Sequence, residues 1–348
     1  MKGILGREET ALYLSRQIND SPIFVLLAGC TEVSKIPGIT GAGANPDLTF
    51  LTPTLDSEII SEGRSLSSEI PPITPSGIPT PAIPSRAMNE LAGIETMIVD
   101  AGLDVQPKTH YFYTGLKPAR NPATEKALPR FEEAYQTGRK LGRLLSKHSL
   151  IIIAETIPGG TTTAQVVMST YGDFKASSSL PLDPSELKMQ IVNGALARQS
   201  HAIGNPLRIV EEYGDYTMAI SLGIISSADT YILLSGGTQM ANIYHLSSSL
   251  QRSALPYLIT NRWLMKHRGE TMRAIVPEGR LLVSGINFSE MMFPGLRAYE
   301  SGIVKEGVGI SAAFFSALAT GKTQPEIYEA IGRYYETFRS HGSAGIIS

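Results

Sequence analysis

The sequence of 348 residues contains a single cysteine, Cys30, so a disulfide within the chain and a site with several cysteine ligands are both excluded. It has no apolar run of about 18 residues, the length that a membrane-spanning helix requires. Lysine plus arginine number 30 and aspartate plus glutamate 32, so the basic excess that binding to nucleic-acid phosphates needs is missing. Residues 1–20 are charged and amphipathic, unlike a secretory signal. We therefore expect a soluble cytoplasmic protein with no nucleic-acid or membrane partner.

Glycine and proline are the residues that the sequence has in excess. There are 33 glycines and 22 prolines, whereas an average chain has roughly 12 % of the two together. Because 42% of the residues are apolar, disorder does not explain this excess, which instead indicates many loops that approach something closely. The prolines concentrate in residues 71–84. We expect this segment to be an ordered, largely extended surface loop, since each proline fixes its own φ angle.

Short apolar runs recur along the chain without alternation of polar and apolar residues. They are residues 23–27, 97–99, 150–153, 231–234 and 281–283. Runs of this kind are typical of strands buried on both faces of a parallel sheet. The helices that we expect lie at 85–92, 129–147, 184–198, 308–320 and 323–339. This pattern predicts an α/β fold, with a Rossmann-like, mainly parallel sheet flanked by helices.

Two helix starts carry a capping-box pattern, an acceptor side chain followed three residues later by glutamate. These are Asp183 with Glu186 and Thr323 with Glu326. For the domain organisation, we expect residues 23–309 to form an α/β nucleotide-binding core that includes the proline-rich loop 71–84. Residues 1–22 and 310–348 are expected to form a small helical subdomain.

The first candidate site follows the apolar run at 150–153. This run ends at Glu155, makes a Pro-Gly-Gly turn and enters a helix through three threonines. Backbone N–H groups at glycines and at a helix N-terminus can face an anion without obstruction by side chains. The residues concerned are Gly159, Gly160, Thr161, Thr162 and Thr163. An ordinary glycine turn with threonine caps is the alternative, but two glycines and three threonines exceed what capping needs, and the segment favours phosphate binding.

A second junction of the same kind, Gly236-Gly237-Thr238, follows the apolar run at 231–234. Ligands of open α/β sheets bind at the carboxyl edge of the strands, so two such junctions at one edge support each other. A third run ends at Asp100 followed by a glycine two residues later, and Asp100 is a further candidate. The six histidines show no paired spacing of metal ligands, and we expect no metal site.

Glu306 stands between Lys305 and two glycines, Gly307 and Gly309, directly before the apolar helix at 308–320. Residues 307–312 fit the dinucleotide pattern G-x-G-x-x-A, but no buried strand precedes them, so that interpretation is weak. The helix dipole stabilises the charged form of a carboxylate placed here, and the flanking glycines would let a flat ligand approach. The alternative is a glutamate that merely caps the helix.

These motifs together resemble the nicotinate-nucleotide:dimethylbenzimidazole phosphoribosyltransferases. Residues 154–162, A-E-T-I-P-G-G-T-T, align without a gap with that family's G-E-M-G-I-G-N-T-T loop. Residues 305–309, K-E-G-V-G, align with its G-E-G-[ST]-G motif, and L-S-G-G-T-Q-M at 234–240 is similar to the archaeal and cyanobacterial branch. The chain departs from the family pattern at Pro158, Gly160 and Lys305. The motifs occur in the family order from residue 71 to residue 312.

The resemblance implies an enzyme that transfers the ribosyl phosphate of nicotinate mononucleotide to an aromatic base and releases nicotinate. The product would be an α-riboside phosphate, the lower ligand of a cobamide. Glu306 would be the catalytic base, Glu155 would lie near the ribose, and the two glycine junctions would hold the phosphate. By family position, an acceptor-base pocket would comprise Ser76, Gly77, Pro79, Thr80, Gly307 and Gly309. No cofactor is implied, and a homodimer is expected from the family.

Two other functions are compatible with the same residues. A non-catalytic protein that binds nucleotides or bases would need only the two phosphate junctions. A phosphorylase-like enzyme would use phosphate instead of a base as the acceptor. Glu306 beside Gly307 and Gly309 favours the transferase over the simple binder, because a binder has no need of a general base.

Overall fold

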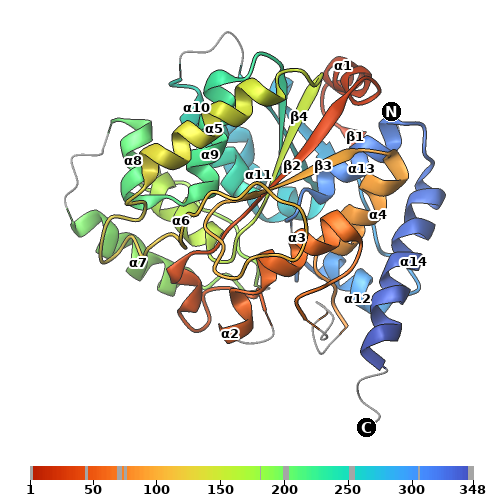
Figure 1. The fold of residues 1–348 in the computed structure, drawn as a ribbon, viewed down its shortest axis with the longest axis horizontal. Helices are drawn as coiled ribbons and strands as arrows, with labels where there is room; N and C mark the ends of the chain where they lie inside the picture. The colour runs from red at the N-terminus through yellow and green to blue at the C-terminus, as the bar shows by residue number, and fades with distance from the viewer. Residues whose placement is uncertain are drawn as a thin grey trace.

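A single sheet forms the centre of the chain in its computed structural model (Figure 1). The structure describes residues 3–43, 46–68, 73, 77–180, 182–198, 204–250, 255–304 and 306–343. The strands are β1 (Ile4–Leu5), β2 (Pro22–Ala28), β3 (Glu95–Asp100), β4 (Leu150–Thr156), β5 (Tyr231–Ser235), β6 (Tyr257–Asn261) and β7 (Leu281–Ser284). Their order is β1-β7-β6-β5-β4-β2-β3, and among the described strands only β1 runs antiparallel to its neighbour. The predicted α/β fold with a mainly parallel sheet is confirmed.

Each of the five apolar runs forms a strand, whereas β1 and β6 have no counterpart in the predictions. The strand β6 is Tyr-Leu-Ile-Thr-Asn, and because its last two residues are polar it does not form a continuous apolar run. The strand β1 is two residues long and is held by pairing with β7, so its conformation depends on a partner far away in the sequence.

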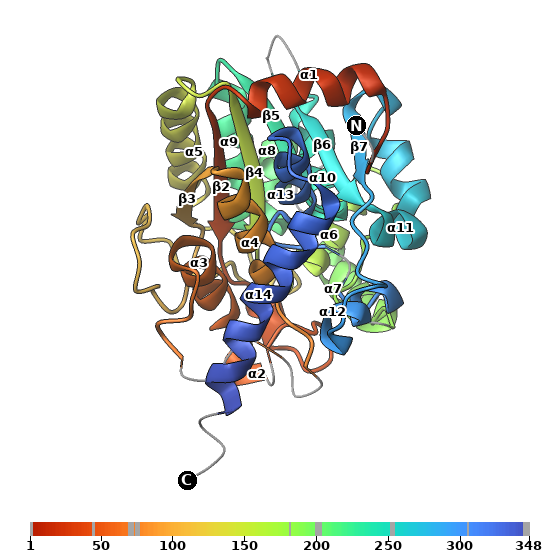
Figure 2. The same ribbon diagram turned by 90° about the vertical axis from the view of Figure 1, so that its right-hand side faces the viewer.

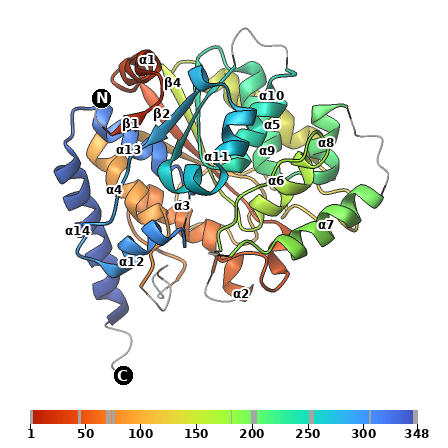
Figure 3. The same ribbon diagram turned by 180° about the vertical axis from the view of Figure 1, so that it is seen from behind.

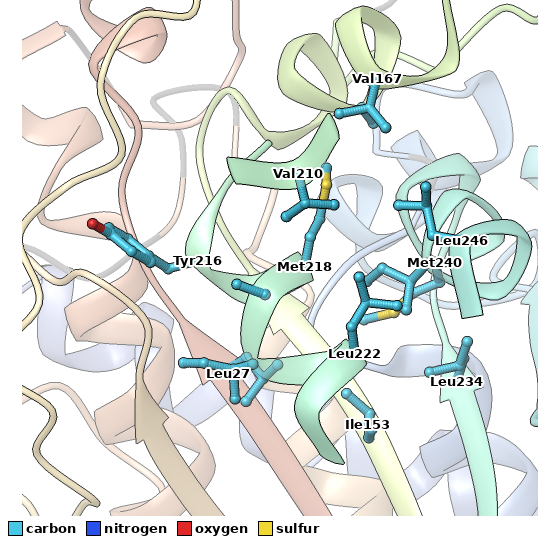
Figure 4. Close-up of a cluster of buried hydrophobic side chains, with 14 of the residues drawn as sticks. Leu27, Ile153, Val167, Val210, Tyr216, Met218, Leu222, Leu234, Met240 and Leu246 are labelled. Carbon is cyan, nitrogen blue, oxygen red and sulfur yellow. The ribbon is translucent and has the colours of Figure 1, made fainter. Parts of the chain in front are cut away.

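Two apolar layers cover the two faces of the sheet, and alternate side chains of each strand enter alternate layers. In β2, Ile23, Val25 and Leu27 join one layer, while Phe24 and Leu26 join the other. The first layer includes α5 (Phe131–Leu145), α6 (Gly160–Met168), α7 (Ser185–Ala197), α8 (Pro206–Tyr213), α9 (Tyr216–Ser227) and α10 (Thr238–Ser247). Figure 4 shows part of it, where Leu222 of α9 lies near Ile153 of β4 and Met240 of α10.

The opposite layer includes α1 (Glu8–Ile18), α3 (Thr52–Glu62), α4 (Ala82–Ala92), α13 (Ile310–Ala319) and α14 (Gln324–Ser343). Figure 2 shows the sheet between α5 and α9 on one side and α4, α13 and α14 on the other. The helix α11 (Arg262–Ile275) contributes to both layers, with Leu264 in the first and Trp263 in the second. Short helices complete the chain: α2 (Pro46–Thr49), α12 (Pro294–Arg297) and the 3₁₀ turns η1 (Glu32–Lys35), η2 (Glu278–Arg280) and η3 (Ala298–Ser301).

Two glycines let α5 and α9 approach each other closely. A Cβ atom on Gly138 would lie 2.2 Å from the carbonyl oxygen of Ile220, and one on Gly223 would lie 2.2 Å from that of Tyr135. Any larger residue would push the two helices apart. Part of the glycine excess therefore serves helix packing and has nothing to do with a ligand.

The two predicted capping boxes have different outcomes. The Oε2 atom of Glu326 accepts hydrogen bonds from the Thr323 amide at 2.8 Å and from its hydroxyl at 2.6 Å, which confirms that box. The capping box predicted at Asp183 and Glu186 does not form, so that prediction is wrong. The helix α7 begins at Ser185 without a side-chain cap, because Asp183 instead pairs with Lys188 at 2.9 Å and with Arg268.

The proline-rich segment is shorter as a loop than predicted, because α4 begins at Ala82 and the last three residues of 71–84 are helical. Prolines at the start of a helix lose no hydrogen bond, which is why Pro84 is tolerated there. Within the segment, residues 71, 72 and 74–76 lie outside the described part of the chain.

The segments predicted as a separate helical subdomain lie against the sheet in the described structure. The strand β1 pairs with β7, and α13 belongs to the apolar layer that covers one face. The helix α14 runs alongside α4 in two opposite views (Figures 1 and 3). The division into subdomains stays a prediction. Among the described helices, none has the length and apolar character that a bilayer crossing demands.

Candidate active site

The direction of the chain through the sheet reverses between β2 and β4. From β2 the chain moves to β3 at one edge, and it then returns past β2 to β4 on the other side. In open α/β sheets, ligands bind at such a reversal, outside the carboxyl ends of the strands. A cavity of about 380 Å³ lies there, and its lining includes residues after β4 and β5. This volume is within the range of small-molecule sites.

The first glycine junction forms one wall of the cavity. The helix α6 begins at Gly160, and Gly159 before it has a φ of +80° that favours glycine. A Cβ atom on Gly159 would lie 2.3 Å from Oγ1 of Thr31, a hydroxyl that donates to the Pro158 carbonyl at 2.8 Å. Gly159, Gly160 and Thr161 line the cavity. The positive dipole end of α6 therefore adjoins it.

The second junction lies beside the first, because the starts of α6 and α10 meet. A Cβ atom on Gly160 would lie 2.3 Å from Oε1 of Gln239, in the first turn of α10. The buried carboxylate of Asp215 ties the two helices together, since it accepts hydrogen bonds from Gln239 at 3.3 Å and from Thr163 at 2.6 Å. Gly237, Thr238 and Gln239 line the cavity. Two helix N-termini therefore converge on one space.

Three residues of the predicted phosphate loops lie behind this wall and are not among the lining residues. They are Thr162, Thr163 and Gly236. Thr163 donates to Asp215, and the hydroxyl of Thr162 is buried without a hydrogen-bond partner among the described residues. These residues support the loops from within the fold.

Glu306 also lines the cavity and is half-buried. Its Oε2 atom accepts hydrogen bonds from the amide of Asn261 and, at 2.7 Å, from the hydroxyl of Ser311. Burial raises the pKa of Glu306 to about 8, the Ser311 groups lower it, and the negative charge of Glu155 raises it. A carboxyl group with a pKa near neutrality is suited to accept a proton during a reaction.

The glycines after Glu306 have different surroundings. Gly307 lines the cavity, whereas Gly309 lies beneath it. The φ of Gly309 is +66°, and a Cβ atom there would lie 2.6 Å from Phe24 and 2.7 Å from Ala154. Gly309 is therefore required by packing on the sheet. Lys305 lies outside the described residues.

Two further carboxyl groups, Glu155 and Asp56, line the same cavity. Burial raises the pKa of Glu155 to about 8, with contributions from the negative charges of Asp215 and Asp56. Asp56, on α3, was not predicted as a site residue and is 2% exposed. Its two oxygens accept hydrogen bonds from the hydroxyls of Thr80 at 2.6 Å and Thr156 at 2.7 Å. Burial raises its pKa to about 6.

The lining that the structure describes has no lysine, arginine or histidine side chain. An anion in this cavity would therefore be held by backbone amides and hydroxyls. Protonation of Glu155 and Glu306, whose pKa is about 8, lowers the electrostatic repulsion that such an anion would meet near neutral pH.

Part of the predicted acceptor-base loop lines the cavity. Pro79 and Thr80 line the cavity, whereas Gly77 does not, and Ser76 lies outside the described residues. Two tyrosines of the C-terminal part hold this loop. Tyr299 donates to the Pro79 carbonyl at 2.9 Å, and Tyr335 of α14 donates to that of Gly77.

Asp100 lies away from the cavity and organises its own turn. Its Oδ1 atom accepts hydrogen bonds from the amides of Gly102 and Leu103, both at 2.9 Å, and Oδ2 accepts one from the Thr114 hydroxyl at 3.2 Å. The glycine and the acid at this strand end therefore build a loop. In the described part of the chain, no group of three or more acidic, histidine or cysteine side chains is arranged to hold a metal ion.

Residues 177–180 also line the cavity and were not predicted from the sequence. The amide of Ser177 donates to the Thr238 hydroxyl at 2.8 Å, and the carbonyl of Ser177 accepts from buried Lys188 at 2.6 Å. The signal in the sequence was the run of serines at 177–179, which looks like an ordinary loop when its neighbours in space are unknown.

The carboxyl groups of Glu155 and Glu306 should make stability fall as pH rises. In the folded protein their pKa is about 8, against 4.5 as the ordinary value, so the folded state holds protons that the unfolded chain releases. Their contribution is complete below about pH 4.5 and is lost as pH rises to about 8. We expect the double variant Glu155→Gln/Glu306→Gln to be the more stable protein at about pH 8.

Urea denaturation at about pH 5 and about pH 8 measures this difference in the free energy of unfolding. The control variant Glu336→Gln, at an exposed position of α14, should follow the parent protein. If the parent and the double variant lost the same stability between the two pH values, these carboxyl groups would not hold protons as described.

Two proteins of similar sequence cover almost all of the chain. A UPF0284 protein of Thermoplasma acidophilum is 41% identical over 338 residues, which are 96% of this chain and 98% of that protein. A UPF0284 protein of Thermoplasma volcanium is 44% identical over 322 residues, which are 92% and 95% of the two chains. No protein-family profile matches the chain.

Two solved structures from Thermus thermophilus have a similar fold. One, described as CobT, has a TM-score of 0.55 at 16% identity and covers 94% of this chain and 89% of its own. The other, a nicotinate-nucleotide-dimethylbenzimidazole phosphoribosyltransferase, has a TM-score of 0.52 at 15% identity, with 95% and 96% covered. At the level of the fold, the resemblance predicted from the motifs is confirmed.

Proposed function

The chain belongs to the UPF0284 family, whose name states no reaction, and we propose that it is a phosphoribosyltransferase. It transfers the ribosyl phosphate of nicotinate mononucleotide to a benzimidazole- or purine-type base and releases nicotinate. The product is an α-riboside phosphate for the lower ligand of a cobamide. One observation carries this proposal: two glycine-rich helix N-termini and Glu306 line a single cavity.

The donor phosphate binds where the starts of α6 and α10 meet. Anions are favoured at helix N-termini because amides without an internal partner point outward and the dipole is positive there. Gly159, Thr161, Gly237 and Thr238 line the cavity and would provide these groups, whereas the Gly160 amide donates to the Ile157 carbonyl at 3.0 Å. Glu155, directly before the first junction, lies beside the ribose. The cavity volume of about 380 Å³ exceeds that of a single phosphate, so a sugar and a ring also fit.

Glu306 activates the acceptor. The ring N–H of a benzimidazole or purine gives its proton to the Glu306 carboxylate, and the nitrogen then forms a bond to C1′ of the ribose. The bond from C1′ to the nicotinate nitrogen breaks at the same centre, and nicotinate leaves with that electron pair. Positive charge develops at C1′, and the carboxylate of Glu155 stabilises it.

The acceptor base lies between the loop at Pro79–Thr80 and the segment at Gly307–Val308. Both segments line the cavity, together with apolar side chains such as Leu55 and Ile78. A flat, largely apolar ring fits such a surface. We extend the proposal to a homodimer in the cytoplasm, as in the family that the motifs resemble.

An assay of free nicotinate tests the proposal. The protein is incubated with nicotinate mononucleotide and either dimethylbenzimidazole or adenine. Release that requires the base supports the transferase. Release that requires inorganic phosphate instead would identify a phosphorylase. Binding of the nucleotide without any release would identify a non-catalytic binder and would refute the transferase.

A further inference from the structure

The two oxygens of the Glu306 carboxylate have different surroundings. Oε2 accepts two hydrogen bonds, one from the Nδ2 group of Asn261 and one from the hydroxyl of Ser311 at 2.7 Å. Oε1 is buried and has no hydrogen-bond partner among the described residues. The two donors on Oε2 therefore fix the position of the carboxylate, and both stabilise its charged form.

The orientation of the Asn261 amide is fixed by a second contact. Asn261 ends β6 and caps α11, where its Oδ1 atom accepts a hydrogen bond from the Leu264 amide at 2.9 Å. The oxygen of the side chain is therefore committed to the helix. Its NH₂ group is left to face Glu306, and rotation of the amide by 180° would break both contacts at once.

Ser311 is held equally firmly, in the first turn of α13. It is fully buried, and the next residue, Ala312, donates its amide to the Ser235 hydroxyl at 3.0 Å. Ser235 is the last residue of β5. The carboxylate of Glu306 is thus fixed from β6 through Asn261 and from α13 through Ser311, and α13 is fixed in turn to β5.

We infer that Asn261 and Ser311 are positioning residues that hold the Glu306 carboxylate in place to accept the proton of the incoming base. This inference rests on the proposed transferase. The proton moves from the ring nitrogen of the base to the Glu306 carboxylate, and the two donors fix the position of that carboxylate through Oε2. Neither residue needs to touch the substrate for this role.

Among the residues that the structure describes, which do not include Lys305, the other titratable groups near Glu306 are acidic or neutral. Glu155, on β4, raises the pKa of Glu306 through its charge, and Tyr299, from η3, is itself influenced by Glu306. Asp56, on α3, lines the same cavity. The donors on Oε2 therefore oppose the effect of burial and of these neighbours, because hydrogen bonds to the charged form favour it.

The test replaces one donor at a time. Asn261→Ser keeps an oxygen that can cap α11 but loses the NH₂ group, and Ser311→Ala loses the hydroxyl, whereas Ser311→Thr keeps it. In the first two variants we expect the titration of Glu306 to move to higher pH by about one unit, the order of one hydrogen bond to a charged group. Ser311→Thr should titrate like the parent.

Two measurements read this shift. NMR of protein with ¹³C-labelled glutamate carboxyl groups follows the titration of Glu306 directly, with Glu306→Gln to assign the signal. The pH profile of kcat for nicotinate release should shift by the same amount, with the KM for nicotinate mononucleotide unchanged. The control Asn205→Ser alters another helix cap, at the start of α8, where Oδ1 accepts from Leu207 and Arg208, and should shift neither.

The outcomes separate this inference from the proposed function. An unshifted NMR titration in both donor variants would overturn the positioning role, whether or not the protein is active. A shifted titration in a protein that releases no nicotinate would refute the transferase and, with it, the role of Glu306 as the acceptor of the substrate proton. A shift in both measurements supports both.

Discussion

Glu306→Gln is expected to lower the rate of nicotinate release by roughly 10²–10⁴-fold, the usual contribution of a general base. Glutamine keeps the size and shape of the side chain but cannot accept the proton of the ring nitrogen. An azole nitrogen that keeps its proton is a poor nucleophile, so the bond to C1′ forms slowly. Steady-state kinetics with nicotinate mononucleotide and dimethylbenzimidazole measure the loss.

The variant should fold normally, because the amide can still meet Ser311, and removal of a carboxyl group whose pKa is about 8 relieves a burial cost at high pH. Near-UV circular dichroism checks this. Glu336→Gln, with the same substitution at an exposed position, should retain full activity. Retention of near-normal turnover by Glu306→Gln would show that another group removes the proton.

Gly160→Ala is expected to lower kcat/KM for nicotinate mononucleotide by roughly 10²-fold or more. The added methyl group would lie 2.3 Å from Oε1 of Gln239 and 2.6 Å from Ile157, so the starts of α6 and α10 would have to separate. Gln239 has little freedom to move because Asp215 and Thr217 hold its amide group. Two displaced hydrogen bonds to a charged phosphate, at about 1.5–3 kcal/mol each, account for this magnitude.

Titration calorimetry with nicotinate mononucleotide would show whether the loss lies in donor binding. Thr161→Ser, the matched control in the same loop, keeps both the hydroxyl and the backbone, and its affinity should be close to that of the parent. If Gly160→Ala bound the nucleotide normally, the phosphate would have to lie away from the meeting point of α6 and α10.

The fold was visible in the sequence because its strands are buried on both faces. A strand such as Ile151-Ile152-Ile153 needs apolar side chains at every position, and such a run is recognisable without any knowledge of its neighbours. The strand β6 ends in Thr260 and Asn261, which are buried but polar. Asn261 caps α11, which begins at the next residue, but its contact with Glu306 joins residues that are 45 positions apart and cannot be read from the local sequence.

The site was visible in part for a similar reason. The glycine junctions and Glu306 belong to local motifs, and a local motif can be recognised from the sequence alone. Asp56 sits in an ordinary helical stretch, and nothing in that stretch indicates that α3 delivers its carboxyl group to Thr80 and Thr156. The capping box at Asp183 failed for the converse reason, since a local pattern was overridden by Lys188 and Arg268.

The hydrogen bond from Tyr335 to Gly77 has a consequence for the newly made protein. The two residues are 258 positions apart, and at roughly 5–20 residues per second a ribosome needs on the order of 10–50 s to synthesise the intervening chain. Throughout that interval the loop beside the cavity exists without its support from α14. The nascent chain should therefore acquire its ability to bind a base only after the last helix has left the ribosome and docked.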